Sequence, residues 1–111
     1  MAAFTTLREN KDFRALYSRG RSEVHPALVT YVRKNRCGEP RIGITTGKKL
    51  GKAVQRSRAR RVIREGFRPL LGQVGGYDIV FVARTRTTEM KSTQLTPVIE
   101  KHLKQLGVIG E

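Results

Sequence analysis

A strongly basic run with helical spacing spans residues 48–68 and constrains the fold more than any other part of the chain. Nine of its residues are Lys or Arg, and Glu65 is its one acidic residue. At 100° per residue, apolar residues fall on one side of a helix that begins at Val54 or Arg56 and ends at Leu70. That apolar side consists of Ala59, Val62, Ile63, Gly66, Phe67 and Leu70. The opposite side consists of Ser57, Arg61, Arg64 and Arg68, with Arg60 flanking them. Such a segment must bury its apolar side and leave its arginines in solvent.

The arginine side of this helix has the chemistry of a polyanion-binding surface. Arg60 and Arg64, and likewise Arg64 and Arg68, are like-charge pairs four residues apart, which destabilise a helix unless a ligand screens them. The 111-residue chain carries a formal net charge of +14, and a partner of opposite charge relieves the resulting self-repulsion. Nucleic acid is the first candidate partner, because neutralising phosphates releases counterions. An anionic membrane surface is the second.

Two glycines precede the basic helix and indicate a turn. The segment from Gly47 to Lys52 lacks the Gly-Lys-Ser/Thr ending of a phosphate-binding loop, which argues against a nucleotide-hydrolysing site. We expect Gly47 and Gly51 to shape a strand-to-helix turn that brings Lys48, Lys49 and Lys52 close to a backbone phosphate. The positive end of the helix dipole adds to the attraction there.

The sequence predicts further elements before and after this helix. They are a helix between residues 10 and 20, strands at 27–33, 41–46 and 79–83, a helix over 95–106 capped by Gly107, and a possible strand at 85–88. Turn residues at 35–40 predict that the first two strands pair as a hairpin. Pro97 is either the first helical position after a Thr96 cap or an early kink. We therefore expect one α+β domain over residues 1–111, with about three helices on a four-stranded sheet.

The chain lacks the residue pattern of an autonomous enzyme. Its acidic residues and two histidines are spread widely in the sequence, and no pair has metal-ligand spacing. His102 lies on the apolar stripe of the last helix and is expected to pack structurally, and His25 is expected in a loop. Cys37 has no disulfide partner, which fits a reducing compartment. With no transmembrane-length apolar run and no secretory signal, the chain is expected to be cytoplasmic.

Aromatic residues divide into two groups. Phe67 and Phe81 are expected in the core. Phe13, Tyr17 and Tyr31 are open to two interpretations: they pack between the first helix and a strand, or their rings stack on unpaired bases.

The chain resembles the protein subunit of bacterial ribonuclease P. The resemblance rests on the arginine-rich signature Gly51-Lys52-Ala53-Val54-x-Arg56-Ser57-Arg58-x-Arg60-Arg61-x-Ile63-Arg64-Glu65. Upstream it includes Arg41-Ile42-Gly43-Ile44 and Lys48-Lys49, and downstream the Asp-led strand Tyr77-Asp78-Ile79-Val80-Phe81-Val82-Ala83-Arg84. The likeness covers roughly residues 7–106. Two positions depart from the family pattern: Ser57 stands where Asn is usual, and Gly47 where Ser is common.

The resemblance implies a specific fold and a specific activity. The fold would be a small ribosomal protein S5 domain 2-like sandwich with a left-handed βαβ crossover, an exception to the usual handedness. The activity would be removal of the 5′ leader from precursor tRNA by a holoenzyme whose active site and Mg²⁺ belong mainly to a catalytic RNA. The resemblance also implies that the protein needs no obligatory protein partner and does not contact a membrane. It implies that this chain carries no catalytic or metal-binding residue.

The resemblance also assigns two binding surfaces. The catalytic RNA would contact the basic segment, namely Lys48, Lys49, Lys52, Arg56, Ser57, Arg58, Arg60, Arg61, Arg64 and Arg68. The single-stranded leader would lie in the cleft between the first helix and the sheet, against Phe13, Tyr17 and Tyr31. A structural RNA-binding protein of the ribosome is the alternative function, and a DNA-coating basic protein is a third.

Overall fold

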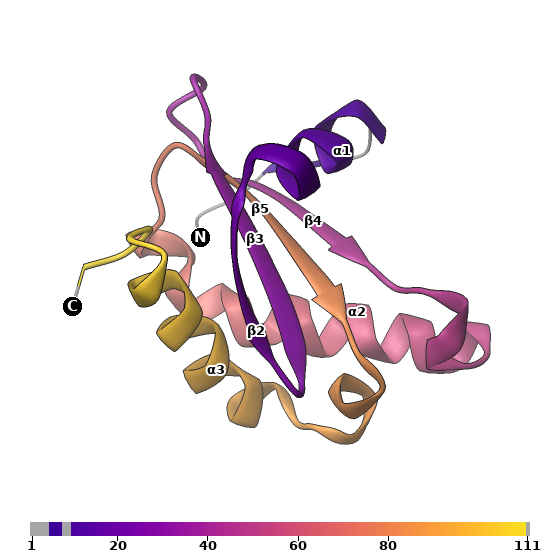
Figure 1. Cartoon of the computed structure of the whole chain (residues 1–111). Coiled ribbons are helices and arrows are strands. Elements are labelled where there is room, and N and C mark those ends of the chain that lie inside the picture. Colours follow the sequence, from indigo (N-terminus) through magenta and orange to yellow (C-terminus); the bar gives the residue numbers. More distant parts are fainter. Residues whose placement is uncertain (1–4, 8–9, 111) are drawn as a thin grey trace.

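A mixed sheet lies between one helix on one face and two helices on the other (Figure 1). The computed structural model describes residues 5–7 and 10–110. Its strands are β1 (Thr5–Thr6), β2 (Arg21–His25), β3 (Leu28–Lys34), β4 (Arg41–Thr45) and β5 (Tyr77–Ala83). Its α-helices are α1 (Asn10–Arg19), α2 (Ala53–Phe67) and α3 (Ser92–Gln105), and its 3-10 helices are η1 (Lys48–Leu50), η2 (Arg68–Gln73) and η3 (Thr85–Glu89). The expectations for the first residues of the chain, including the absence of a signal segment, lie partly outside the described residues.

The apolar strand β5 occupies the centre of the sheet. The strand order is β1-β4-β5-β3-β2, so β5 pairs parallel with β4 and antiparallel with β3. The predicted hairpin of residues 27–33 with 41–46 is therefore wrong, because β5 lies between these two strands. β3 instead forms its hairpin with β2, with Val24 opposite Val29. A strand with apolar side chains on both faces buries most apolar surface at the centre of a sheet, which explains why β5 lies between β3 and β4.

Two further expectations about the sheet are corrected. Residues 85–88 belong to the 3-10 helix η3, and the fourth long strand is β2, whose last residue is His25. Threonine side chains stabilise η3: the Arg84 N–H donates to Thr87 Oγ1 (3.0 Å), and Thr88 Oγ1 donates to the Thr85 carbonyl (2.7 Å). These local hydrogen bonds compete with a strand ladder. β2 was missed because it is a largely exposed edge strand without a clean apolar alternation.

The connection from β4 through α2 to β5 is left-handed. The two strands are parallel neighbours, and α2 lies behind the sheet in Figure 1. When β4 and β5 are turned to point upward in that view, β5 lies to the right of β4. The handedness that the resemblance implied is therefore present, along with the α+β sandwich.

The main core fills the space between the sheet and the pair α2 and α3. Phe67 and Phe81 meet there with ring centroids 5.4 Å apart, as expected of core residues. On the opposite face, α1 covers a smaller core through Leu16. Gly43 lets this helix approach the sheet, because a Cβ at that position would lie 2.8 Å from Cε1 of Phe13.

Helix α3 begins earlier than the sequence pattern suggested. The first alternative for Pro97, the first helical position after a Thr96 cap, is wrong, since the helix starts at Ser92 and Pro97 lies inside it. The second alternative, an early kink, stays a prediction. Thr96 does not cap the helix; its hydroxyl donates to the Gly66 carbonyl of α2 at 2.7 Å. The predicted ending is confirmed, because Gly107 has φ +76° and the next N–H bonds back to the Leu103 carbonyl at 2.8 Å.

An ion pair ties the first residue of β4 to β5 beneath α1. Arg41 donates from Nε to Asp78 Oδ1 (2.7 Å) and from a terminal nitrogen to Asp78 Oδ2 (2.6 Å). Asn35 Nδ2 donates to the same Oδ1 at 2.9 Å. This forked geometry adds direction as well as charge attraction, and the hydrogen bond to Asp78 raises the pKa of Arg41 above its usual value.

Candidate nucleic-acid interface

Helix α2 presents a continuous basic surface on the outside of the molecule. The predicted division of the helix is confirmed: the expected apolar side is buried against the sheet and α3. The side chains of Ser57, Arg60, Arg61 and Arg64 are exposed. Because α2 packs on the sheet through its apolar side, this basic surface faces away from the sheet.

The cations of α2, and Arg68 at the start of η2, differ in how they are held. Arg58 donates from Nε to the Thr88 carbonyl of η3 at 2.9 Å, and Arg68 lies 3.7 Å from Glu65 in an exposed ion pair. Arg56 is half-buried, and its Nε has no hydrogen-bond partner among the described residues. Within the same residues, no ion pair or side-chain hydrogen bond engages Arg60, Arg61 or Arg64, which leaves these guanidinium groups free to bind a ligand.

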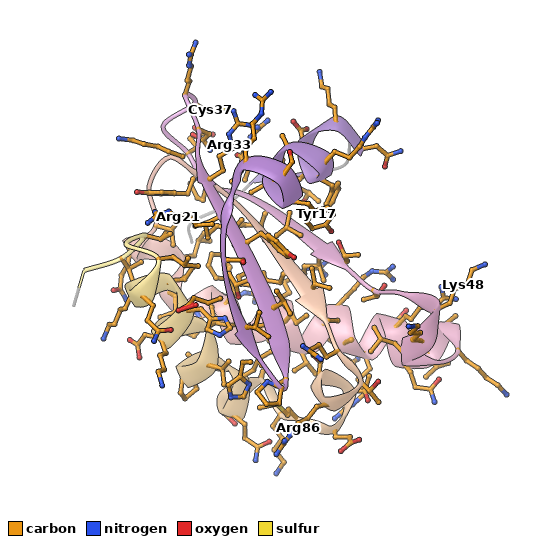
Figure 2. All side chains as sticks on the ribbon, in the orientation of Figure 1. Tyr17, Arg21, Arg33, Cys37, Lys48 and Arg86 are labelled. Carbon is orange, nitrogen blue, oxygen red and sulfur yellow. The ribbon has the colours of Figure 1, made fainter. Side chains whose placement is uncertain are left out.

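The turn before α2 carries the predicted lysines at one end of the molecule. Lys48, which is labelled in Figure 2, is exposed on η1. Lys49 is exposed beside it in the sequence, and Leu50 is buried and anchors this short helix. Lys52 is also exposed, and its N–H donates to Oε1 of Gln55 at 2.7 Å, which caps the start of α2. The lysines are thus held next to the positive end of the helix.

The three candidate aromatic residues lie on the α1 side of the sheet, but they differ in packing and exposure. Phe13 is half-buried and packs over Gly43 in the smaller core. Tyr17 is 42% exposed, and its ring meets that of Tyr31 edge-on at a centroid distance of 4.9 Å. The Tyr17 hydroxyl lies 3.1 Å from Oγ1 of Thr45 at the end of β4. Tyr17 is therefore the most exposed of the three rings, and Phe13 and Tyr31 are both half-buried.

A hollow of about 600 Å³ lies between the lysine turn and Thr45, whose Oγ1 meets the Tyr17 hydroxyl of this aromatic surface. Thr45 and Val82 line it from the sheet, and Lys48, Lys49 and Arg84 line it from the segments that follow β4 and β5. Sequence reasoning missed Thr45 and Arg84 as site residues. Their positions at strand ends could have indicated a site, because Thr45 ends β4 and Arg84 follows β5. The carboxyl ends of neighbouring parallel strands meet at one edge of a sheet.

The comparisons with known proteins agree with one another. A family model described as Ribonuclease P matches residues 1–107 of the chain. The chain belongs to the ribonuclease P protein family. It is 38% identical over 104 residues to the ribonuclease P protein component of Clostridium botulinum strain Loch Maree, covering 92% of this chain and 94% of that one. It is 36% identical over 111 residues to that of Alkaliphilus oremlandii, covering 99% and 97%.

Solved ribonuclease P proteins have the same fold. The Staphylococcus aureus protein superposes with a TM-score of 0.84 at 31% identity, covering 97% of this chain and all of that one. The Thermotoga maritima protein gives a TM-score of 0.77 at 30% identity, covering 96% and 98%. The predicted function, that of a ribonuclease P protein subunit, is confirmed, and the ribosomal alternative has no support. None of the described helices has the length and apolar content needed to span a bilayer.

The described residues of this ribonuclease P protein do not form a site suited to Mg²⁺. They contain no group of three His, Cys, Asp or Glu side chains able to surround a metal ion. Asp78 is committed to Arg41, and Asp12 lies 4.0 Å from the same guanidinium. A hard cation prefers several free oxygen ligands, and these two carboxylates do not offer them.

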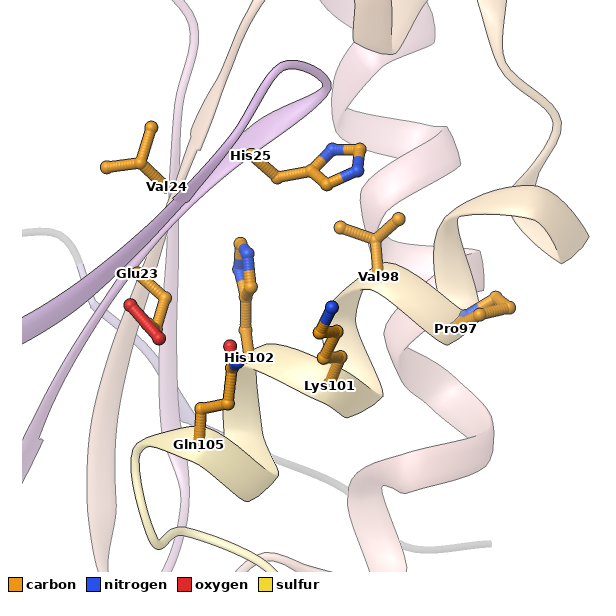
Figure 3. Close-up of a pocket in the computed structure, with 8 residues that line it drawn as sticks. All are labelled: Glu23, Val24, His25, Pro97, Val98, Lys101, His102 and Gln105. Carbon is orange, nitrogen blue, oxygen red and sulfur yellow. The ribbon is translucent and has the colours of Figure 1, made fainter.

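The two histidines lie beside a hollow between β2 and α3 (Figure 3). The packed role predicted for His102 is confirmed: it is 4% exposed, and its Nδ1 lies 2.8 Å from Oγ1 of Thr30. Burial lowers the pKa of His102 below its usual value; Glu23 opposes this, and His25 and Lys101 add to it. The neutral imidazole is therefore the form that the fold accommodates.

We expect this histidine to make folding stability depend on pH. The unfolded chain binds a proton at His102 near pH 6.5 and the native state does not, so the free energy of unfolding falls as pH drops below about 6.5. One proton contributes a slope of at most about 1.4 kcal/mol per pH unit. Urea unfolding of the natural chain and His102→Gln between pH 8 and 5 checks this. The variant should lose part of the slope, and equal slopes would contradict the assignment.

Proposed function

We propose that this ribonuclease P protein holds the catalytic RNA on the basic surface of α2 and the 5′ leader of precursor tRNA on the α1 side of the sheet. The observation that carries the proposal is the arrangement of the two surfaces. α1 and α2 lie on opposite faces of the sheet (Figure 1), and the turn bearing Lys48 and Lys49 adjoins both. One small domain can therefore contact two RNA segments at once.

The basic surface suits a folded RNA. Exposed arginines spaced along α2 can follow a phosphate backbone, and the planar guanidinium groups bind phosphates in two places or stack on bases. Lys48, Lys49 and Lys52 extend the surface beyond the start of the helix. Binding by charge neutralisation also explains why the chain tolerates like-charged arginines one turn apart on α2.

The aromatic surface suits an unpaired strand. Tyr17 and Tyr31 offer ring surfaces on which successive bases can stack, and stacking of this kind tolerates many base sequences. The hollow beside Arg84 leads from Thr45, which meets the Tyr17 hydroxyl, to the lysine turn, where a backbone phosphate would find positive charge. Phe13 contributes by holding α1 on the sheet, since its ring packs over Gly43. The processing reaction itself, with Mg²⁺, would belong to the RNA. A tRNA-processing role supports a cytoplasmic location for the chain.

Reconstitution tests the assignment as a whole. The protein mixed with the catalytic RNA should speed removal of the 5′ leader at low Mg²⁺, where phosphate repulsion is poorly screened. The measurement is the single-turnover cleavage rate with and without the protein. An unchanged rate at low Mg²⁺ would contradict the assignment.

The leader surface is tested by truncating one exposed ring. In the reconstituted holoenzyme, Tyr17→Ala is expected to reduce the preference for precursor over mature tRNA by about 5- to 150-fold, which corresponds to the roughly 1–3 kcal/mol of one stacked base. The readout is the ratio of the two equilibrium dissociation constants. Tyr17→Phe is the matched control, because it removes the hydroxyl that meets Thr45 but keeps the ring, and it should retain most of the preference. A full preference in the alanine variant would place the leader elsewhere.

A further inference from the structure

A hollow on the first two turns of α2 contains an exposed apolar side chain, which phosphate binding by this helix does not require. The hollow has a volume of about 640 Å³, and Ala53, Val54, Ser57, Arg58 and Arg61 line it. Val54 is 79% exposed, so it adds nothing to either core. Valine is also a weaker helix former than the Lys, Arg or Gln residues that would suit an exposed position. An apolar side chain here is unfavourable in water and gains only if a ligand covers it.

The two arginines that line the hollow are held differently. Arg58 is fixed in place, since its Nε donates to the Thr88 carbonyl of η3 at 2.9 Å. Arg61 is exposed and has no hydrogen-bond partner among the described residues. Arg58 is thus tethered to η3, and the guanidinium group of Arg61 is available to an occupant. The small side chains of Ala53 and Ser57 leave room for a flat group beside the two arginines.

We infer that this hollow binds one unpaired nucleobase of the catalytic RNA, with the base lying on Val54 and between the guanidinium groups of Arg58 and Arg61. A base offers a flat apolar face to Val54, and the adjoining phosphates carry negative charge to the arginines. A phosphate alone would leave Val54 exposed, and an acidic peptide would leave it opposite a charged or polar side chain. The inference rests on the proposed function, in which α2 is the surface for the catalytic RNA.

The test separates contact with a base from contact with phosphates. Val54→Ser removes the exposed apolar side chain without changing charge, and Ala53→Leu fills the hollow while adding apolar surface. Both positions are exposed on the helix, so neither change disturbs the core. The affinity of each full-length variant for the catalytic RNA is measured over a series of salt concentrations. Val24→Ser, at a 67% exposed valine on the distant edge strand β2, is the control.

Both α2 variants should bind the catalytic RNA at least about fivefold more weakly, the lower end of what one stacked base contributes. The slope of log affinity against log salt should stay unchanged, because every phosphate remains bound to its cation. Dimethyl sulfate probing should show one unpaired base that the natural protein protects and Val54→Ser leaves reactive, and Val24→Ser should behave as the natural chain. Tighter binding by Ala53→Leu, or natural affinity in both variants, would overturn the base site alone. Failure of the natural chain to bind the catalytic RNA would overturn the proposed function together with it.

Discussion

Replacing Arg61 and Arg64 together with Ala is expected to weaken binding of the catalytic RNA and to flatten its salt dependence. Removing one cation from a phosphate should lower the slope of log affinity against log salt by about 0.7–0.9, so removing two should lower it by roughly 1.6. If the two salt plots converge near 1 M, the affinity near 0.1 M salt falls about 40-fold. The reason is structural: both guanidinium groups are exposed and unengaged among the described residues. Filter binding or fluorescence anisotropy over a salt series measures both quantities.

A second pair of cations provides the control for net charge. Lys101→Ala with Lys104→Ala removes the same two charges from α3, which lies outside the proposed contact surface. This variant should keep most of the affinity and the slope. If both double variants weakened binding equally, the RNA would be responding to net charge and not to the surface of α2. An unchanged slope in the arginine variant would rule out direct phosphate contacts by Arg61 and Arg64.

Arg41→Ala is expected to cause the larger of two losses of stability at the junction of β4 and β5. The change strands the Asp78 carboxylate, whose side chain is 11% exposed, with Asn35 as its remaining hydrogen-bond donor. Breaking a buried pair typically costs about 3–5 kcal/mol. Because the Arg41 side chain is 29% exposed and partly screened, we expect about 2–4 kcal/mol. Asp78→Ala should cost less, since Arg41 can turn to water or to Asp12. Chemical unfolding at neutral pH measures the free energies.

An exposed ion pair serves as the reference for this measurement. Glu100 and Lys104 lie 3.9 Å apart on α3, with side chains 41% and 37% exposed. Glu100→Ala should change the free energy of unfolding by less than about 1 kcal/mol. Equal effects at the two sites would mean that burial of Asp78 does not govern the cost. A smaller loss in Arg41→Ala than in Asp78→Ala would contradict the proposed order.

Local sequence patterns predicted the helices better than the sheet. Helix α2 and its buried side follow from 3.6-residue periodicity, which depends on neighbours within two turns. The interior strand β5 follows from an unbroken apolar run. The predicted hairpin of β3 with β4 is wrong because strand pairing depends on which strand, near or distant in the chain, buries the most apolar surface. Here β5 takes the place beside β3 and β4. The sequence pattern did not predict β2, because an exposed edge strand needs no apolar alternation.

The candidate site divides in the same way. The sequence by itself determined that residues 48–68 form a basic helix with one buried side, because charge and periodicity are properties of that segment alone. It also supported the family resemblance, from which an RNA partner is predicted. Only the tertiary structure decided that Tyr17 meets Tyr31, that Arg84 joins Lys48 beside the aromatic surface, and that Arg58 is fixed by Thr88. These contacts join segments that lie far apart in the chain. They are set by how β4, β5 and α2 pack together, which no local pattern encodes.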